Sequence, residues 1–242
     1  MTSRPDQIHA EEQHVHPSAL QAGRLFFELY CGPRSVSVLD VGSMDVNGTL
    51  RGFAAAGCHY VGADLEPGNG VDVVLESAHK LPFESESFDA VVSTSCFEHD
   101  RFFWLTFLEC IRVLRKGGYF YLNVPSNGVY HRYPVDCWRF YPDAALALAE
   151  WARHQGLQAE VVESFLLNQI DDIWNDFVCV FERCEPGQGL SRGGASGAGH
   201  IHPHFSAATN IWVAGAQNVQ RFAFEPEDMR RLAKLPQTSG QT

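Results

Sequence analysis

The sequence predicts an α/β fold in which helices cover both faces of a doubly wound, mostly parallel β-sheet. Short runs rich in β-branched and aromatic residues, such as 35–41 and 88–94, alternate with stretches of helical periodicity, such as 100–116. Glycines and prolines stand where helices end or begin, as at Gly117 and Pro142. Ligands of such sheets bind beyond the carboxyl ends of the strands, so the loops there are the first places to search for a site.

The composition is that of one folded domain without affinity for polyanions. The 242 residues include 17 Phe, 7 Tyr and 5 Trp, which is ample material for a core. The formal net charge of −11 argues against nucleic acid or an anionic membrane as partner. Seven cysteines form no Cys-x-x-Cys pair, and the N-terminal residues contain no apolar run typical of a signal peptide. We therefore expect a soluble, cytoplasmic protein with reduced thiols.

Residues 1–16 are polar and are predicted to form a flexible N-terminal arm, and residues 17–242 a single domain. In the first half of that domain, apolar spacing predicts helices and alternation of apolar and polar residues predicts strands. The predicted elements are a helix at 17–30, a strand at 35–41, a helix at 48–56, and strands at 59–64, 71–75 and 88–94.

In the second half the same alternation continues and then breaks. The helix at 100–116 carries Arg112, Arg115 and Lys116 in its last turn, where positive charge suits the helix dipole. Six glycines between 187 and 199 indicate a mobile loop within an insertion at 185–205. The other predicted elements are strands at 119–124, 157–167 and 209–214 and helices at 142–155, 171–184 and 226–235.

The loop after the first strand predicts a nucleotide-like ligand. Gly42 allows close approach of backbone to a ligand, but Met44 and Asn47 replace the later glycines of a dinucleotide fingerprint. Asp40 would repel a pyrophosphate and suits a cationic group instead. Asp64 closes the second strand about 20 residues after Gly42, a spacing typical of an acid that binds ribose hydroxyls. A cationic group and a ribose together describe S-adenosylmethionine better than NAD, although a helix cap and a turn residue remain the alternative for the two acids.

The runs VLDVGS, VGADL, LPFESESFDAVVSTSCFEH and FLECIRVLRKGGYFYLNVP resemble the class I S-adenosylmethionine-dependent methyltransferases, most of all the methyltransferase type 11 group. The resemblance covers about residues 36–124. It implies a Rossmann-like, seven-stranded, three-layer α/β/α fold whose last strand, 209–214, is antiparallel. It also implies cofactor contacts from the first loop, from the end of the second strand, from the position where relatives read adenine, and from the loop after the fourth strand. The residues concerned are Asp40, Gly42, Ser43, Asp64, Leu65, Ser77, Ala78 and Ser95.

The loop at 126–141 is the predicted acceptor site, because it is dense in aromatic and titratable side chains. Methyl transfer to a hydroxyl needs alignment and a proton acceptor, and His131 and Asp136 are the predicted catalytic residues. The alternative for Asp136 is an ion pair with Arg139 that shapes the loop. The run His-x-x-Pro-x-Asp-x-x-Arg-Phe is similar to one in methyltransferases encoded with sugar and polysaccharide enzymes, which suggests a sugar hydroxyl as acceptor.

Two histidine-containing segments receive no site role: the first is interpreted as structural rather than catalytic, and a metal site is disfavoured for the second. Glu98 and His99 are shared with the resembling group, where the histidine is often structural. His200, His202 and His204 alternate along the chain, but no acid or cysteine accompanies them in sequence, so no metal is assigned. Whether they bind one, and whether the glycine-rich loop closes as a lid over the acceptor, stay open.

These features predict a methyltransferase that uses S-adenosylmethionine and O-methylates a small-molecule or carbohydrate acceptor. The alternative is a catalytically degenerate, methyltransferase-like binding module, which the unusual Met44 and Ser77 favour. We expect no nucleic-acid or membrane partner, and a homodimer is compatible with the sequence.

Overall fold

The computed structural model describes residues 17–46, 48–132, 134–167, 174–191, 199–206 and 208–215. The predicted N-terminal arm, most of the glycine-rich loop and the predicted helix at 226–235 lie outside the described residues. The extent of the single domain therefore stays a prediction.

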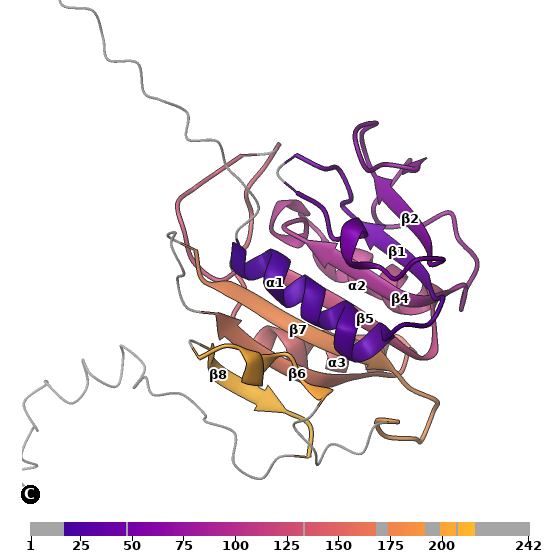
Figure 1. The fold of residues 1–242 in the computed structure, drawn as a ribbon, viewed down its shortest axis with the longest axis vertical. Helices are drawn as coiled ribbons and strands as arrows, with labels where there is room; N and C mark the ends of the chain where they lie inside the picture. Colours follow the sequence, from indigo (N-terminus) through magenta and orange to yellow (C-terminus); the bar gives the residue numbers. More distant parts are fainter. Residues whose placement is uncertain are drawn as a thin grey trace, which may run out of the picture.

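An eight-stranded sheet forms the centre of the described structure, in the order β3-β2-β1-β4-β5-β7-β6-β8 (Figure 1). Neighbouring strands are parallel from β3 to β5, whereas β7 is antiparallel to both of its neighbours and β8 is antiparallel to β6. The strands are β1 (Ser37–Val41), β2 (His59–Asp64), β3 (Val73–Val74), β4 (Phe88–Thr94), β5 (Leu114–Pro125), β6 (Ala159–Leu167), β7 (Asp176–Arg183) and β8 (Ala208–Val213). The predicted fold class and the antiparallel last strand are confirmed, with eight strands among the described residues instead of seven.

The extra strand is β7, which replaces a predicted helix at 171–184. Its residues are buried along the whole strand. Phe177, Cys179 and Phe181 belong to the hydrophobic core on one face of the sheet, and Val178 and Val180 to the core on the opposite face. A strand buried on both faces is a continuous apolar run, and periodicity alone does not separate such a run from a buried helix. The prediction failed for that reason.

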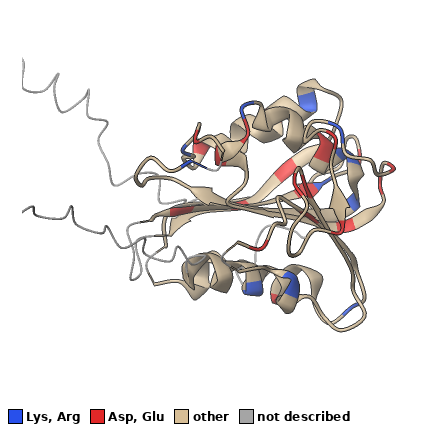
Figure 2. Ribbon diagram, turned by 90° about the horizontal axis from the view of Figure 1, so that it is seen from above, with Lys and Arg blue, Asp and Glu red and all other residues tan. Residues whose placement is uncertain are grey.

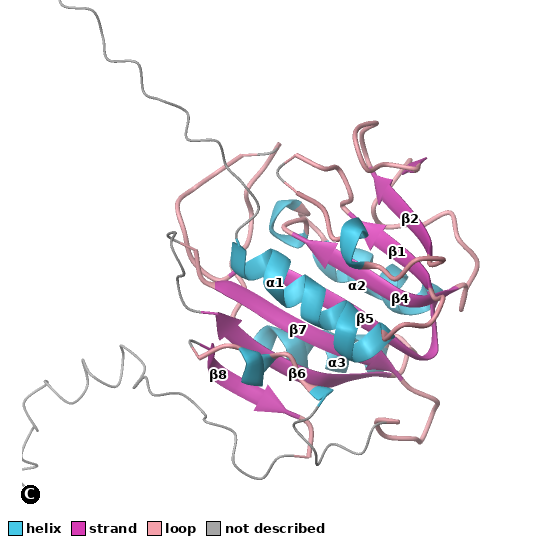
Figure 3. Cartoon of the chain, in the orientation of Figure 1, coloured by secondary structure: helices cyan, strands magenta, loops and turns pink. Residues whose placement is uncertain are grey.

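Helices lie on both faces of the sheet, which gives three layers (Figure 2). The helix α1 (Pro17–Phe26), continued by a wider turn at Phe27–Cys31, covers one face, and α2 (Phe103–Val113) and α3 (Asp143–His154) cover the other (Figure 3). Strand residues alternate between the two cores. Tyr119 and Tyr121 pack on the α1 side, and Phe120 and Leu122 on the α2 and α3 side.

The predicted helix at 48–56 is wrong, because only a single turn of 3₁₀-helix forms at Arg51–Phe53. Arg51 holds the connection in place instead. Its guanidinium lies over the Tyr60 ring, donates to the Gly70 carbonyl (3.0 Å) and pairs with Asp72. Two glycines in this short segment also lower its helical propensity.

The helix at 100–116 is shorter than predicted, since α2 ends at Val113 and β5 begins at once. Arg115 and Lys116 therefore lie in the strand. Their charges are paired with Asp89 (2.6 Å) and Glu185 (2.9 Å) instead of complementing the helix dipole.

Within the described residues, no helix combines the length and apolar character needed to span a bilayer.

Candidate cofactor and acceptor site

The loop after β1 lies against the residues that follow β4. Gly42 has φ +81°, and a Cβ at this position would lie 2.5 Å from the Cβ and Sγ of Cys96. Its amide donates to the Ala63 carbonyl (2.9 Å) at the end of β2. Gly42 thus meets both requirements that favour glycine, a left-handed backbone and a close approach.

Asp64 joins the ends of β1 and β2. One carboxylate oxygen accepts a hydrogen bond from the Met44 amide (3.0 Å) and the other from the Leu65 amide (2.7 Å). Met44 itself packs over the β2 loop, where a Cβ on Gly68 would approach its side chain to 3.1 Å. Met44, which replaces a glycine of the usual pattern, therefore has room for its side chain because residue 68 is a glycine.

Asp40 has a partner inside the protein. Its buried carboxylate accepts a hydrogen bond from the Tyr60 hydroxyl (2.7 Å). Burial raises the pKa of Asp40 to about 6, while the Tyr60 hydrogen bond and the charge of Arg51 act in the opposite direction. Its contact with a cationic group of the cofactor stays a prediction.

The other predicted cofactor residues lie in loops at the same end of the sheet. Leu65 follows β2 and is 52% exposed, and the Ser77 hydroxyl accepts a hydrogen bond from the His79 amide (3.1 Å) beside Ala78. Ser95 follows β4 with φ +49°, an uncommon conformation for a residue other than glycine. The Ser95 side chain is exposed, and its role toward the methionine side of the cofactor stays a prediction.

Two buried hydroxyls at this end of the sheet have no hydrogen-bond partner among the described residues. They belong to Ser43, after β1, and to Thr94, at the end of β4. Buried hydroxyls are normally satisfied, so a polar ligand is expected here. S-adenosylmethionine offers ribose hydroxyls, an ammonium and a carboxylate, and the residues present fit that group.

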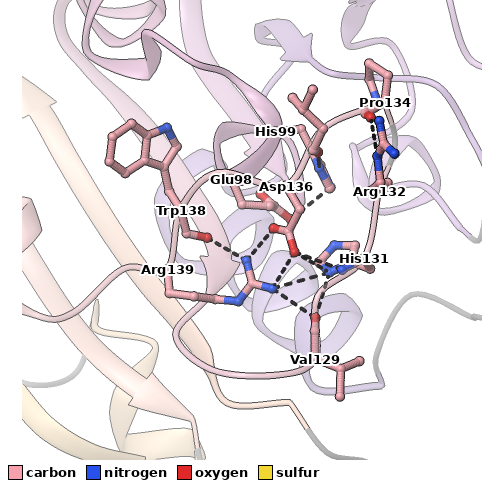
Figure 4. Close-up of polar contacts among 10 residues, drawn as sticks. Glu98, His99, Val129, His131, Arg132, Pro134, Asp136, Trp138 and Arg139 are labelled. Atoms are coloured by element: carbon pink, nitrogen blue, oxygen red, sulfur yellow. Dashed lines mark hydrogen bonds and ion pairs between the residues drawn. The ribbon is translucent and has the colours of Figure 1, made fainter.

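On the acceptor side, the predicted alternative for Asp136 is the one that forms. Arg139 donates to its two carboxylate oxygens at 2.5 and 2.8 Å, and the His131 amide donates to one of them at 2.8 Å (Figure 4). The Arg139 hydrogen bonds lower the pKa of Asp136 to about 2. Such an acid is a weak proton acceptor, which favours the alternative in which the ion pair shapes the loop over the predicted catalytic role of Asp136.

The acceptor loop is fastened to the turn that follows β4, a 3₁₀-helix at Phe97–His99. The Glu98 carbonyl accepts hydrogen bonds from the amides of Cys137 (2.8 Å) and Trp138 (3.2 Å). The Trp138 indole also donates to the Asp100 carbonyl (2.8 Å). These bonds bring 126–141 next to residues almost 40 positions earlier in the sequence.

As a result, Glu98, His99 and His131 converge. Each offers one ligand atom, and the three atoms lie within 4.8 Å of one another. The two imidazole rings meet edge to face with centroids 4.9 Å apart. Glu98 is only 1% exposed, and burial raises the pKa of its carboxyl to about 8.

Trp174 belongs to the same site and was missed by the sequence interpretation. Its ring lies 5.1 Å from the His131 ring and 5.9 Å from the Arg139 guanidinium carbon. Gly128 makes room for it, since a Cβ there would lie 1.9 Å from the indole. The glycine was the only signal in the sequence, because Trp174 stands about 40 residues from the loop that it contacts.

The histidine segment at 200–204 has an acidic partner that is distant in the sequence. Glu163 of β6 is fully buried and lies 2.8 Å from His202 Nδ1. It also accepts hydrogen bonds from the Tyr30 hydroxyl (2.7 Å) and from the amides of Ile201 (2.7 Å) and His202 (3.2 Å). The described part of this segment is therefore tied to the middle of β6, on the α1 side of the sheet.

The model of a methyltransferase domain family matches residues 39–122. This range begins within β1 and ends within β5, and it includes Gly42 and Cys96. Over residues 39–122 the chain therefore resembles the class I S-adenosylmethionine-dependent methyltransferases.

Curated proteins with similar sequences come from mycobacteria. One is the phthiotriol/phenolphthiotriol dimycocerosates methyltransferase of Mycobacterium tuberculosis, 36% identical over 97 residues, which are 38% of this chain and 32% of that protein. Another is a probable phthiotriol/phenolphthiotriol dimycocerosates methyltransferase 2 of Mycobacterium ulcerans, 29% identical over 69% of this chain and 63% of that protein. The chain thus spans between about a third and just under two thirds of these relatives.

Solved structures show the same fold at low identity. The 1,6-didemethyltoxoflavin-N1-methyltransferase of Burkholderia thailandensis, with bound 1,6-didemethyltoxoflavin and S-adenosylhomocysteine, gives a TM-score of 0.55 at 17% identity and covers 69% of this chain and 79% of that one. The YcgJ protein of Bacillus subtilis gives 0.53 at 14% identity, covering 70% of this chain and all of that one.

All the predicted cofactor residues lie within the matched range, 39–122. The acceptor loop and Trp174 lie beyond it. The family match therefore supports the cofactor half of the site, and the acceptor half has to be argued from its own geometry.

Proposed function

We propose that the chain transfers the methyl group of S-adenosylmethionine to a hydroxyl of a small-molecule or carbohydrate acceptor. The observation that supports this most is the position of the acceptor loop, which the Glu98 carbonyl holds beside the turn after β4. The cofactor loops after β1 and β2 reach the same place through Gly42 and Cys96. Donor and acceptor sites are then adjacent, as an in-line transfer requires.

When bound, S-adenosylmethionine would supply a sulfonium methyl group, whose C–S bond breaks with its electron pair left on sulfur as the new C–O bond forms. The acceptor hydroxyl would give its proton to the His131 imidazole or to water. In this proposal Asp64 binds the ribose, and Ser43 and Ser95 line the methionine side. The main role of these residues is alignment, since the methyl group is already activated by its positive charge.

His131 is the residue proposed to face the reacting hydroxyl. Asp136 and Arg139 fix its backbone, and the His99 and Trp174 rings pack against its imidazole from two sides. An imidazole confined in this way loses little entropy when an acceptor binds. Nearby, Tyr130 and Tyr141 are exposed and provide flat surfaces on which a sugar ring can stack.

Calorimetry with S-adenosylmethionine tests the cofactor half. We expect Asp64→Ala to weaken binding at least tenfold, because the carboxylate both fixes the Met44 amide and is proposed to bind the ribose. Glu66→Ala, a change to an exposed acid two residues on, is the matched control and should bind as the parent does. A parent protein that does not bind S-adenosylmethionine at high micromolar concentration would refute the proposal.

Transfer of a tritiated methyl group to polar and lipid fractions of cell extracts tests the acceptor half. His131→Ala should lower kcat more than tenfold and leave the affinity for the cofactor unchanged. Label in an alkali-stable ether supports the hydroxyl acceptor, and label on nitrogen contradicts it. Cofactor binding without transfer to any fraction would favour the alternative, a degenerate binding module.

A further inference from the structure

The turn after β4 and the acceptor loop together form a cluster of one buried carboxylate and two imidazoles. Glu98 and His99 come from the turn, and His131 comes from the loop. In sequence the first two are separated from the third by more than 30 residues, and no metal site was assigned to them. Their convergence is a property of the tertiary structure.

Both imidazoles have their Nδ1 atoms directed at protein oxygens. His99 Nδ1 contacts the Val135 carbonyl. His131 Nδ1 lies 3.3 Å from the Val129 carbonyl, and 3.5 Å from both the Asp136 carboxylate and the Arg139 guanidinium. A ring whose Nδ1–H is donated to a carbonyl or carboxylate presents the lone pair of Nε2. Histidines that bind metals are oriented in this way by a second layer of hydrogen bonds.

The carboxylate of Glu98 is incompletely satisfied. It is 1% exposed, and its Oε2 atom has no hydrogen-bond partner among the described residues. Its Oε1 atom lies 3.7 Å from His99 Nε2. Buried carboxylates are normally paired, hydrogen-bonded or bound to a metal, and Oε2 has no such partner among the described residues.

We propose that Glu98, His99 and His131 bind a divalent transition-metal ion, with zinc as the best-suited ion. Two nitrogens and one carboxylate oxygen form a donor set that zinc accepts, with at least one coordination position left open. Two nitrogen or oxygen ligands of a tetrahedral zinc ion are about 3.3–3.6 Å apart. The three atoms lie within 4.8 Å of one another, so side-chain movements of roughly 1 Å would bring them to that spacing.

The unfilled coordination position of the metal could bind the methyl acceptor, and this part of the inference rests on the proposed function. The metal would lie between the cofactor loops and the acceptor loop, where an oxygen of the acceptor can become its fourth ligand. Ligation to a cation favours loss of a hydroxyl proton to water and fixes the oxygen for alkylation. His131 then acts on the acceptor through the metal instead of as a free base.

Cobalt(II) titration of the chelator-treated, full-length protein tests the site without any methyl transfer. Cobalt bound in a protein site of low coordination number absorbs in the visible range, unlike the aqueous ion. We expect saturable binding of one equivalent, competed by zinc, and at least tenfold weaker binding in Glu98→Gln and in His131→Ala. His154→Ala, an exposed histidine beside Glu150, should leave the titration unchanged.

Circular dichroism and thermal unfolding of each variant show whether it is folded, and His131→Asn offers a second, less disruptive change. Zinc should raise the Tm of the parent and leave that of folded Glu98→Gln unchanged. Absence of saturable binding below 100 µM cobalt, or equal binding in the parent and both variants, would overturn the metal site. Since cofactor calorimetry is independent of this titration, failure of either proposal is recognised separately.

Discussion

Two buried glutamates of this protein stand in similar surroundings and have opposite hydrogen-bonding states. Glu163 lies on the α1 side with His202, and its oxygens accept hydrogen bonds from the Tyr30 hydroxyl and two backbone amides. Glu98 lies at the carboxyl end of the sheet with two histidines, and one of its oxygens has no partner among the described residues. A buried acid whose bonds are complete stabilises the fold, whereas one that lacks bonds indicates a ligand.

The largest expected effect is on stability, and it separates the two glutamates. Glu163→Ala removes the acceptor of several buried donors and should lower the free energy of unfolding by about 3–5 kcal/mol. Glu98→Gln keeps the shape of a side chain whose Oε2 is unpaired, and should change it by less than about 1 kcal/mol. Urea unfolding of both variants measures the difference. Similar losses would show that the two acids have the same structural role.

A third buried acid, Asp40, is expected to make the free energy of unfolding depend on pH. Its pKa is raised from 3.8 to about 6, so between these values the unfolded chain is ionised while the folded one holds a proton. The contribution of Asp40 to stability is therefore greatest below pH 4 and is lost as the pH rises through 6. At 1.36 kcal/mol for each pKa unit, the loss is on the order of 3 kcal/mol.

Asp40→Asn should remove this part of the pH dependence. The difference in free energy of unfolding between parent and variant, measured in urea from pH 4 to pH 8, should change most between pH 4 and pH 6. A difference that is constant across the range would show that Asp40 is ionised in the folded protein despite its burial.

A smaller loss of stability than in Glu163→Ala is expected at the histidine that pairs with Glu163. His202→Ala removes the ring nitrogen 2.8 Å from the carboxylate, yet Tyr30 and the two amides remain as donors. We expect a loss of about 1–2 kcal/mol in urea unfolding. His204→Ala, an exposed neighbour, should lose no more than about 0.5 kcal/mol. Equal losses would indicate that the ring of His202 adds nothing to the Glu163 cluster.

Much of the cofactor half was accessible from the sequence because its residues are contiguous with strand ends. Asp40, Gly42 and Asp64 stand at the carboxyl ends of β1 and β2, and parallel strands bring such ends to one edge. Local patterns also located α2, α3 and every strand except β7. Two predictions were wrong for local reasons. The helix at 48–56 does not form because two glycines lower its helical propensity and Arg51 holds the segment by other contacts. The strand β7 was predicted as a helix because it is buried on both faces.

The sequence by itself determined the α/β class, the edge of the sheet at which a ligand is predicted to bind, and the residue types available there. Only the tertiary structure decided which side chains meet: Glu98 with His131, Trp174 with Gly128, and Glu163 with His202. The physical reason is that these contacts join segments separated by roughly 30 to 50 residues, through backbone hydrogen bonds and packing that no local periodicity encodes. Sequence patterns report the environment of a residue within its own element, whereas a site depends on the neighbours that other elements supply.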